Sequence, residues 1–134
     1  MDGYPFSVPI QVRWRDLDAF AHVNNATFAS YLEVARSQVW HELFGGREAM
    51  DLSFFVKRLE IDYRRSVHLY DEVKVWLRVG GVRGASFTFE YLVESNKTVA
   101  ATAVTLLASV DTTIGKPRRI DPDLRATLET LQLK

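Results

Sequence analysis

Apolar and polar residues alternate with a period of two in four stretches of the chain, which is typical of strands with one buried face. These stretches are 8–14, 58–64, 73–79 and 86–93. A fifth run, from Val99 to Val110, carries Ala, Thr and Val on both faces, which predicts a strand covered on both sides. Pro9 cannot donate to a ladder of hydrogen bonds, so the first strand is expected to have a free or irregular start.

Between the first two strands the apolar period changes to that of a helix. The helix is expected to begin after an N-cap at Asn24 or Asn25 and to end at Gly45-Gly46. At 1.5 Å per residue it would be roughly 28 Å long, which is enough to cross a small domain. Its predicted apolar face consists of Phe28, Tyr31, Leu32, Ala35, Val39, Leu43 and Phe44.

Turn-forming residues separate the later strands. Gly80-Gly81 and Gly84 mark one connection, and Ser95-Asn96-Lys97 predicts a tight hairpin turn. A short amphipathic helix is predicted from Asp121-Pro122 through Leu131. The order of one strand, a long helix, four strands and a terminal helix predicts an α+β fold. In this fold a curved antiparallel sheet of about five strands wraps one helix.

Composition narrows the class of protein. The 134 residues suit a single domain spanning 1–134, and 47% hydrophobic residues are enough for a globular core. The absence of cysteine excludes disulfides, thiolate metal sites and cysteine nucleophiles, and suits a reducing compartment. The 17 basic residues balance 17 acidic ones, so no overall field favours nucleic acid or anionic membranes. With no signal peptide and no apolar span long enough for a membrane, a cytoplasmic protein is expected.

The densest group of chemically active side chains lies between the first strand and the long helix. The segment from Asp16 to Asn25 contains two carboxylates, Asp16 and Asp18, two amides, Asn24 and Asn25, and the imidazole of His22. In one interpretation they only form turns and cap the helix. In the other, the helix start offers unpaired backbone N–H groups to a developing oxyanion while a carboxylate faces the same carbonyl.

This segment resembles the signature of the hotdog-fold acyl-CoA thioesterases related to 4-hydroxybenzoyl-CoA thioesterase. The strongest motif is Asp16-x-Asp18 followed by His22-Val23-Asn24-Asn25, and weaker similarities occur at 61–65, 71–73, 86–91 and 101–106. The resemblance covers nearly the whole chain. It implies a hotdog fold, hydrolysis of an acyl-CoA thioester to a free acid and coenzyme A, and no cofactor or metal. It also implies a homo-oligomer, a dimer or a tetramer, with strands paired across subunits.

The resemblance also assigns roles to single residues. Asp18 matches the catalytic carboxylate, acting as general base or nucleophile, and the backbone N–H of Asn25 matches the donor that polarises the thioester carbonyl. His22 either supports the loop or orients the substrate and positions water. Ala21 stands where related sequences usually have glycine, so a positive φ is not expected there.

Four further residues are candidates for substrate contact: Asn24, Phe28, Tyr63 and Ser66. For Asn24 a helix cap is the favoured interpretation and substrate contact the lesser one, and the alternation explains Tyr63 as core. The aromatic residues that could wall the pocket are Phe20, Phe28, Tyr31, Phe54 and Phe55.

Other polar residues receive structural interpretations. Asp16 is expected to tie down the loop, and Glu33 and Arg36 to form a surface pair. His41 and His68 are interpreted as isolated residues. Basic side chains that could bind coenzyme A phosphates, or equally form a solvated rim, are Arg64, Arg65, Arg83, Lys116, Arg118 and Arg119.

Two alternative functions stay open: hydrolysis of acyl groups carried by acyl carrier protein, and non-catalytic binding of acyl-CoA. A hotdog dehydratase is disfavoured because the separate histidine and acidic pair of that family are not found. A serine hydrolase is disfavoured because the chain has no Gly-x-Ser-x-Gly motif.

Overall fold

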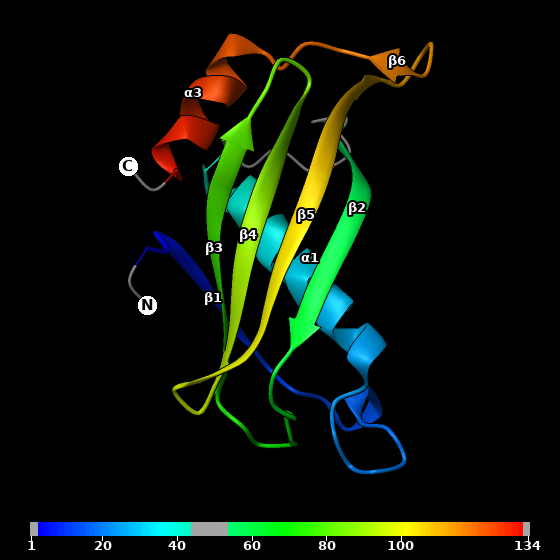
Figure 1. Ribbon diagram of the computed structural model, residues 1–134, viewed down its shortest axis with the longest axis vertical. Coiled ribbons are helices and arrows are strands. Elements are labelled where there is room, and N and C mark those ends of the chain that lie inside the picture. The colour runs from blue at the N-terminus through cyan, green and yellow to red at the C-terminus, as the bar shows by residue number, and fades with distance from the viewer. Residues whose placement is uncertain (1–2, 44–53, 133–134) are drawn as a thin grey trace.

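The computed structural model describes residues 3–43 and 54–132 of the chain. One long helix, α1 (Asn25–Leu43), lies across a curved antiparallel sheet, and a short helix, α3 (Pro122–Thr130), lies at one end (Figure 1). The long strands are β1 (Phe6–Ile10), β2 (Phe54–Tyr63), β3 (Val73–Val82), β4 (Ser86–Ser95) and β5 (Thr98–Asp111). The predicted α+β hotdog fold is therefore confirmed, with two small additions: η1 (Trp14–Asp16), a turn of 3₁₀ helix, and β6 (Lys116–Pro117).

The strands lie in the order β1-β3-β4-β5-β2, every neighbouring pair is antiparallel, and β6 pairs with β5. Strands β1 and β2 therefore form the two edges of this five-stranded order. Pro9 pairs with Lys74 of β3, and the edge position of β1 tolerates a residue without an N–H group.

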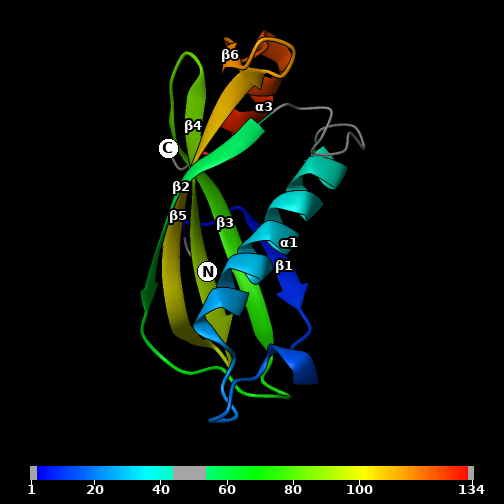
Figure 2. The ribbon, with the colours of Figure 1, turned by 90° about the vertical axis from the view of Figure 1, so that its right-hand side faces the viewer.

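The core lies between α1 and the concave face of the sheet (Figure 2). The buried helix residues are Phe28, Tyr31, Leu32, Ala35, Val39 and Trp40. The Trp40 ring lies 5.5 Å from the ring of Phe89 in β4, which places the two elements in direct contact. The expected helix end at Phe44 and Gly45-Gly46 lies outside the described residues.

Burial along two strands differs from the sequence pattern. Strand β5 was expected to be covered on both sides, but from Ala101 to Ser109 buried residues alternate with partly exposed ones, because α1 covers one face (Figure 2). In β2, Leu59 and Tyr63 are 40% and 44% exposed instead of buried. The physical reason is that β2 lies at an edge of the sheet, where fewer neighbours cover its side chains.

The first strand is also shorter than its alternation indicates. Val8, Ile10 and Val12 are buried as expected, but β1 ends at Ile10 and Trp14 lies in the 3₁₀ turn. The turn breaks the period of two, so the Trp14 side chain is 79% exposed rather than directed inward.

The turns follow the sequence with one correction. Asn96 and Lys97 both have positive φ, 49° and 67°, so the predicted hairpin turn between β4 and β5 is confirmed. Gly80-Gly81 lies inside β3 at a break in register rather than in the connection. A Cβ atom at Gly80 would collide with the side chain of Thr88, which explains the glycine there. Within the described residues no helix combines the length and apolar character that a membrane span needs.

Candidate active site

Asp16 anchors the loop that leads into α1. Its carboxylate is 1% exposed, and it accepts hydrogen bonds from the Arg13 backbone N–H at 2.9 Å and from the Tyr31 hydroxyl at 2.8 Å. The Arg13 guanidinium adds an ion pair at 2.9 Å, and the Asn24 N–H donates to the Asp16 carbonyl at 2.8 Å. Burial alone would raise the pKa of Asp16, but these hydrogen bonds and the guanidinium charge lower it overall. The predicted role of Asp16 in tying down the loop is confirmed.

Asp18 is held in the same loop by backbone groups. Its Oδ1 accepts hydrogen bonds from the N–H of Phe20 at 2.9 Å and of His22 at 3.3 Å, while its own N–H donates to the His22 carbonyl at 2.7 Å. Among the residues that the structure describes, no hydrogen-bond partner is found for the second oxygen, Oδ2. One oxygen therefore fixes the carboxylate, and the other is free for a substrate or a water molecule.

The conformation of Ala21 contradicts the sequence expectation. Ala21 has a φ of 62°, in the left-handed region that favours glycine. The tight turn from Asp18 to His22 is closed by hydrogen bonds from Asp18 N–H to His22 O and from Ala21 N–H to Asp18 O, and a left-handed residue is needed to close it. The loop thus keeps a glycine-like geometry although the residue is alanine.

The start of α1 leaves the backbone N–H of Asn25 available among the described residues. Asn24 is the N-cap, as predicted: its Oδ1 accepts the N–H of Ala26 at 2.8 Å, and its carbonyl accepts the N–H of Thr27 at 2.9 Å. Across the described part of the chain, no acceptor is found for the N–H of Asn25. The Asn25 carbonyl accepts a hydrogen bond of 2.7 Å from the Tyr63 hydroxyl, which fixes the end of β2 against the helix start.

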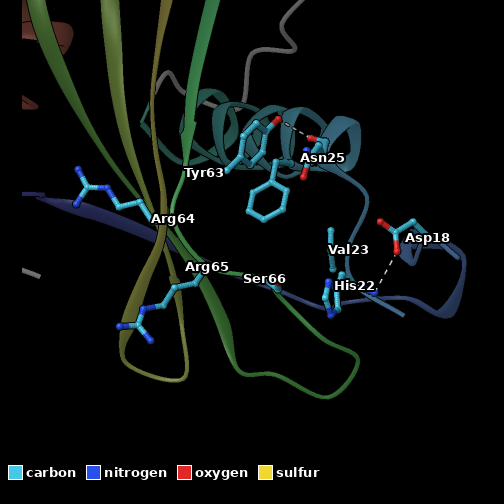
Figure 3. Close-up of a pocket in the computed structure, with 9 residues that line it drawn as sticks. Asp18, His22, Val23, Asn25, Tyr63, Arg64, Arg65 and Ser66 are labelled. Carbon is cyan, nitrogen blue, oxygen red and sulfur yellow. Dashed lines mark hydrogen bonds between the residues drawn. The ribbon is translucent and has the colours of Figure 1, made fainter. Parts of the chain in front are cut away.

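A pocket of about 240 Å³ lies where this loop, the helix start and the end of β2 meet. Figure 3 shows Asp18 and His22 at one end of it and Arg64 and Arg65 at the other. The lining residues are Asp18, His22, Val23, Asn25, Phe28, Tyr63, Arg64, Arg65 and Ser66. The fold therefore brings together six of the seven predicted site residues, and Asn24 lies outside the lining as the helix cap.

Tyr63 belongs to the pocket rather than to the core. Its ring contacts Phe28 edge to face at 5.2 Å, and the residue is 44% exposed.

The other aromatic residues that were predicted to wall the pocket lie elsewhere in the structure. Phe20 and Phe55 are exposed, and Tyr31 is buried against Asp16.

Phe54 lies at a different cavity, which measures about 400 Å³ and is also lined by Glu33, Arg36 and Trp40. There Arg36 donates a hydrogen bond of 3.3 Å to the Tyr91 hydroxyl, and the described residues show no Glu33–Arg36 ion pair. The predicted surface pair is therefore wrong, because the Arg36 side chain reaches across to β4.

Of the six basic candidates for phosphate contact, only Arg64 and Arg65 line this pocket. Their backbone N–H groups both donate to the Ala100 carbonyl, at 2.8 and 3.0 Å, so the pairing of β2 with β5 continues up to the pocket. His68 was interpreted as isolated, but its ring lies 4.7 Å from that of His22. The two histidines are 46 positions apart, and no local pattern could have indicated this contact.

Comparisons with known proteins agree with this fold. Residues 12–128 match the model of the Thioesterase-like superfamily. The acyl-CoA thioesterase YbgC of Haemophilus influenzae is 30% identical over 95% of this chain and 96% of that protein. The long-chain acyl-CoA thioesterase FadM of Escherichia coli is 30% identical over 91% of this chain and 96% of that protein.

A thioesterase from Thermus thermophilus, crystallised with coenzyme A and zinc, is 36% identical and superimposes with a TM-score of 0.87 over 98% of this chain and 97% of its own. The chain therefore belongs to the Thioesterase-like superfamily, and it is a thioester hydrolase of hotdog fold. The family, fold and enzyme class that the sequence resemblance predicted are confirmed.

The zinc in that related crystal has no matching site among the described residues of this chain. No three His, Cys, Asp or Glu side chains are arranged there to hold a metal ion. The described residues therefore do not fit a zinc centre.

Proposed function

We propose that this chain hydrolyses acyl-CoA thioesters to a free acid and coenzyme A in the pocket at the start of α1. One observation carries the proposal: the free oxygen of Asp18 and the unpaired N–H of Asn25 belong to residues that line the same pocket. A thioester needs little more than a positioned carboxylate and a donor aimed at the developing oxyanion. The relatives named as acyl-CoA thioesterases support the substrate class.

In the proposed reaction the thioester oxygen accepts a hydrogen bond from the Asn25 N–H, where the helix dipole also stabilises negative charge. Asp18 either removes a proton from a water molecule that attacks the carbonyl carbon or attacks that carbon itself. In both cases the carbon–sulfur bond breaks, the thiolate of coenzyme A leaves and is protonated, and one water molecule is consumed. The reaction uses no cofactor.

The remaining pocket residues are proposed to hold the substrate. His22 orients the thioester beside Asp18, while Phe28, Tyr63 and Ser66 contact the groups around the reacting carbon, and Asn24 positions the helix start. Arg64 and Arg65, at the far end of the pocket from Asp18, are proposed to contact the phosphates of coenzyme A (Figure 3). Because acyl-CoA is an intracellular metabolite, we also propose a cytoplasmic location.

We further propose that the enzyme is a homo-oligomer, a dimer or tetramer, that pairs subunits through β2. This edge strand exposes large apolar side chains, with Phe55 at 52%, Val56 at 45% and Leu59 at 40%. An unpaired edge of this kind favours strand addition by a second chain. Light scattering should give at least twice the mass of one chain, and Leu59→Lys should lower that mass while Ile114→Lys, in the exposed turn between β5 and β6, should not. A wild-type monomer would contradict the proposal.

The catalytic assignment is tested with Asp18→Asn, which keeps the shape of the side chain and removes its charge. We expect kcat for release of free coenzyme A to fall about a hundredfold or more, with the unfolding midpoint little changed. Glu129→Gln, an equivalent change on the exposed face of α3, is the matched control and should leave kcat unchanged. Full activity of the Asp18 variant would refute the assignment.

The same assay separates the two alternatives. Faster release from acyl carrier protein than from coenzyme A would favour the carrier-protein thioesterase. Binding of acyl-CoA without any release of free thiol would favour a non-catalytic binding module. A panel of short, long and aromatic acyl-CoA esters would identify the acyl group.

A further inference from the structure

His68 lies in the segment between β2 and β3 and contacts His22, a residue of the pocket. The two imidazole rings are 4.7 Å apart and almost perpendicular, at 89°. This is a favourable edge-to-face arrangement for two aromatic rings. His22 itself lines the pocket, and its backbone N–H donates to Asp18 Oδ1.

Asp71 fixes the position of His68. The Oδ2 atom of Asp71 accepts the His68 backbone N–H at 2.8 Å and lies 3.6 Å from the Nδ1 atom of the His68 ring. The Asp71 carboxylate is in turn held by the hairpin between β4 and β5, through Ser95 Oγ at 3.1 Å and Asn96 Nδ2 at 3.0 Å. Burial alone would raise the pKa of Asp71, but these hydrogen bonds lower it overall, so the carboxylate stays ionised beside His68.

The backbones that carry the two histidines are also joined. The N–H of Val23 donates to the Val67 carbonyl at 2.8 Å, and both valines are buried, at 3% and 0% exposure. Each valine is the immediate neighbour of one histidine. The contact between the rings therefore rests on a fixed backbone spacing rather than on two freely rotating surface side chains.

We propose that His68 is a positioning residue for His22: the ring of His68, held by Asp71, fixes the orientation of the His22 imidazole beside Asp18. This inference rests on the proposed function, because it gives His22 a place in the thioester pocket. It gives residues 67–71, which lie outside the motif around Asp18, a part in the reaction. The expected consequence is an effect on turnover more than on substrate affinity, because His68 itself does not line the pocket.

A double-mutant cycle tests the proposal. We expect His68→Ala to lower kcat about three- to tenfold while KM changes less than about twofold, and His68→Phe, which keeps an aromatic edge, to restore most of the loss. In a His22→Ala background, His68→Ala should have no further effect on kcat. An equal loss of kcat in both backgrounds, or no loss in either, would overturn the inference.

A second measurement does not depend on activity. In spectra of protein labelled with ¹⁵N-histidine, the His22 ring signals, identified by their loss in His22→Ala, should shift in both His68→Ala and Asp71→Asn. His41→Ala, at the exposed end of α1, is the control and should leave them in place. Unshifted His22 signals would overturn the inference even if the protein hydrolysed no acyl-CoA ester. Shifted signals in an inactive protein would leave the contact supported and refute only the proposed function.

Discussion

The hydroxyl of Tyr31 donates a hydrogen bond of 2.8 Å to Asp16 Oδ2, and this contact joins the active-site loop to the second turn of α1. Both residues are buried, and burial together with the neighbouring carboxylate raises the pKa of Tyr31 far above its ordinary value. Tyr31 therefore acts as a permanent donor at physiological pH. Because Asp18 follows Asp16 by two residues, this contact also positions the segment that carries Asp18.

The first prediction concerns this anchor. Asp16→Asn removes the charge that the Arg13 guanidinium and the Tyr31 hydroxyl require, so we expect the free energy of unfolding to fall by about 2–3 kcal/mol. Tyr31→Phe removes one donor and should cost about 1 kcal/mol. Urea denaturation of both variants checks the order, and an Asp16→Asn protein as stable as wild type would show that the anchor contributes nothing.

The second prediction is a loss of stability in acid. The pKa values of Asp16 and Asp71 are both lower in the folded protein than the ordinary pKa of an aspartate carboxyl group. Near and below pH 4 the unfolded chain therefore binds more protons than the folded one, so stability is complete above this range and falls as pH decreases through it. Denaturation curves between pH 7 and pH 3 should show this decline. In the double variant Asp16→Asn/Asp71→Asn, stability should fall less steeply with decreasing pH than in the wild-type protein. An equally steep fall in both proteins would show that these two carboxylates do not cause the loss of stability.

The third prediction uses the left-handed backbone at Ala21. Ala21→Gly removes the steric cost of a φ of 62° but adds freedom to the unfolded chain, and we expect a net gain of about 0.5 kcal/mol. Ala21→Val places a branched side chain in the same conformation and should cost about 1–2 kcal/mol. Thermal unfolding of the three proteins should show stability decreasing in the order Gly, Ala, Val at position 21. If valine were tolerated as well as glycine, the turn would not need a left-handed residue.

The fourth prediction concerns the basic end of the pocket. Replacing Arg64 and Arg65 together by alanine should raise KM for acyl-CoA about tenfold, because two exposed cations would no longer contact its phosphates. An acyl-pantetheine ester, which lacks the nucleotide, should show little change. Arg118→Ala, outside the pocket, is the control. An equal increase of KM for both substrates would indicate that the arginines shape the pocket rather than bind phosphate.

Local patterns predicted most of the fold because they depend on neighbours in sequence. The period of two identified four of the five long strands, a run of Ala, Thr and Val identified the fifth, and the helical period identified α1. Asn96-Lys97 and Asp121-Pro122 marked a turn and a helix start that the structure contains. The motif around Asp18 and Asn25 indicated which loop carries the site. Trp14 and Leu59 were misjudged because alternation shows which side chains share a face but not whether another element covers that face.

The sequence by itself thus determined the elements, the family and the loop between β1 and α1 that carries the carboxylate and the helix-start donor. Only the tertiary structure decided which of the candidates outside this loop line the pocket, among them Tyr63 and Arg64 from the end of β2, and that His68 contacts His22. The physical reason is that these contacts depend on strand register and on the path of the connecting segments, which place residues about 40 positions apart within one hydrogen bond or one ring contact. The left-handed backbone of Ala21, which its side chain alone does not favour, was also visible only in the folded loop, where hydrogen bonds between Asp18 and His22 and between Ala21 and Asp18 close the turn.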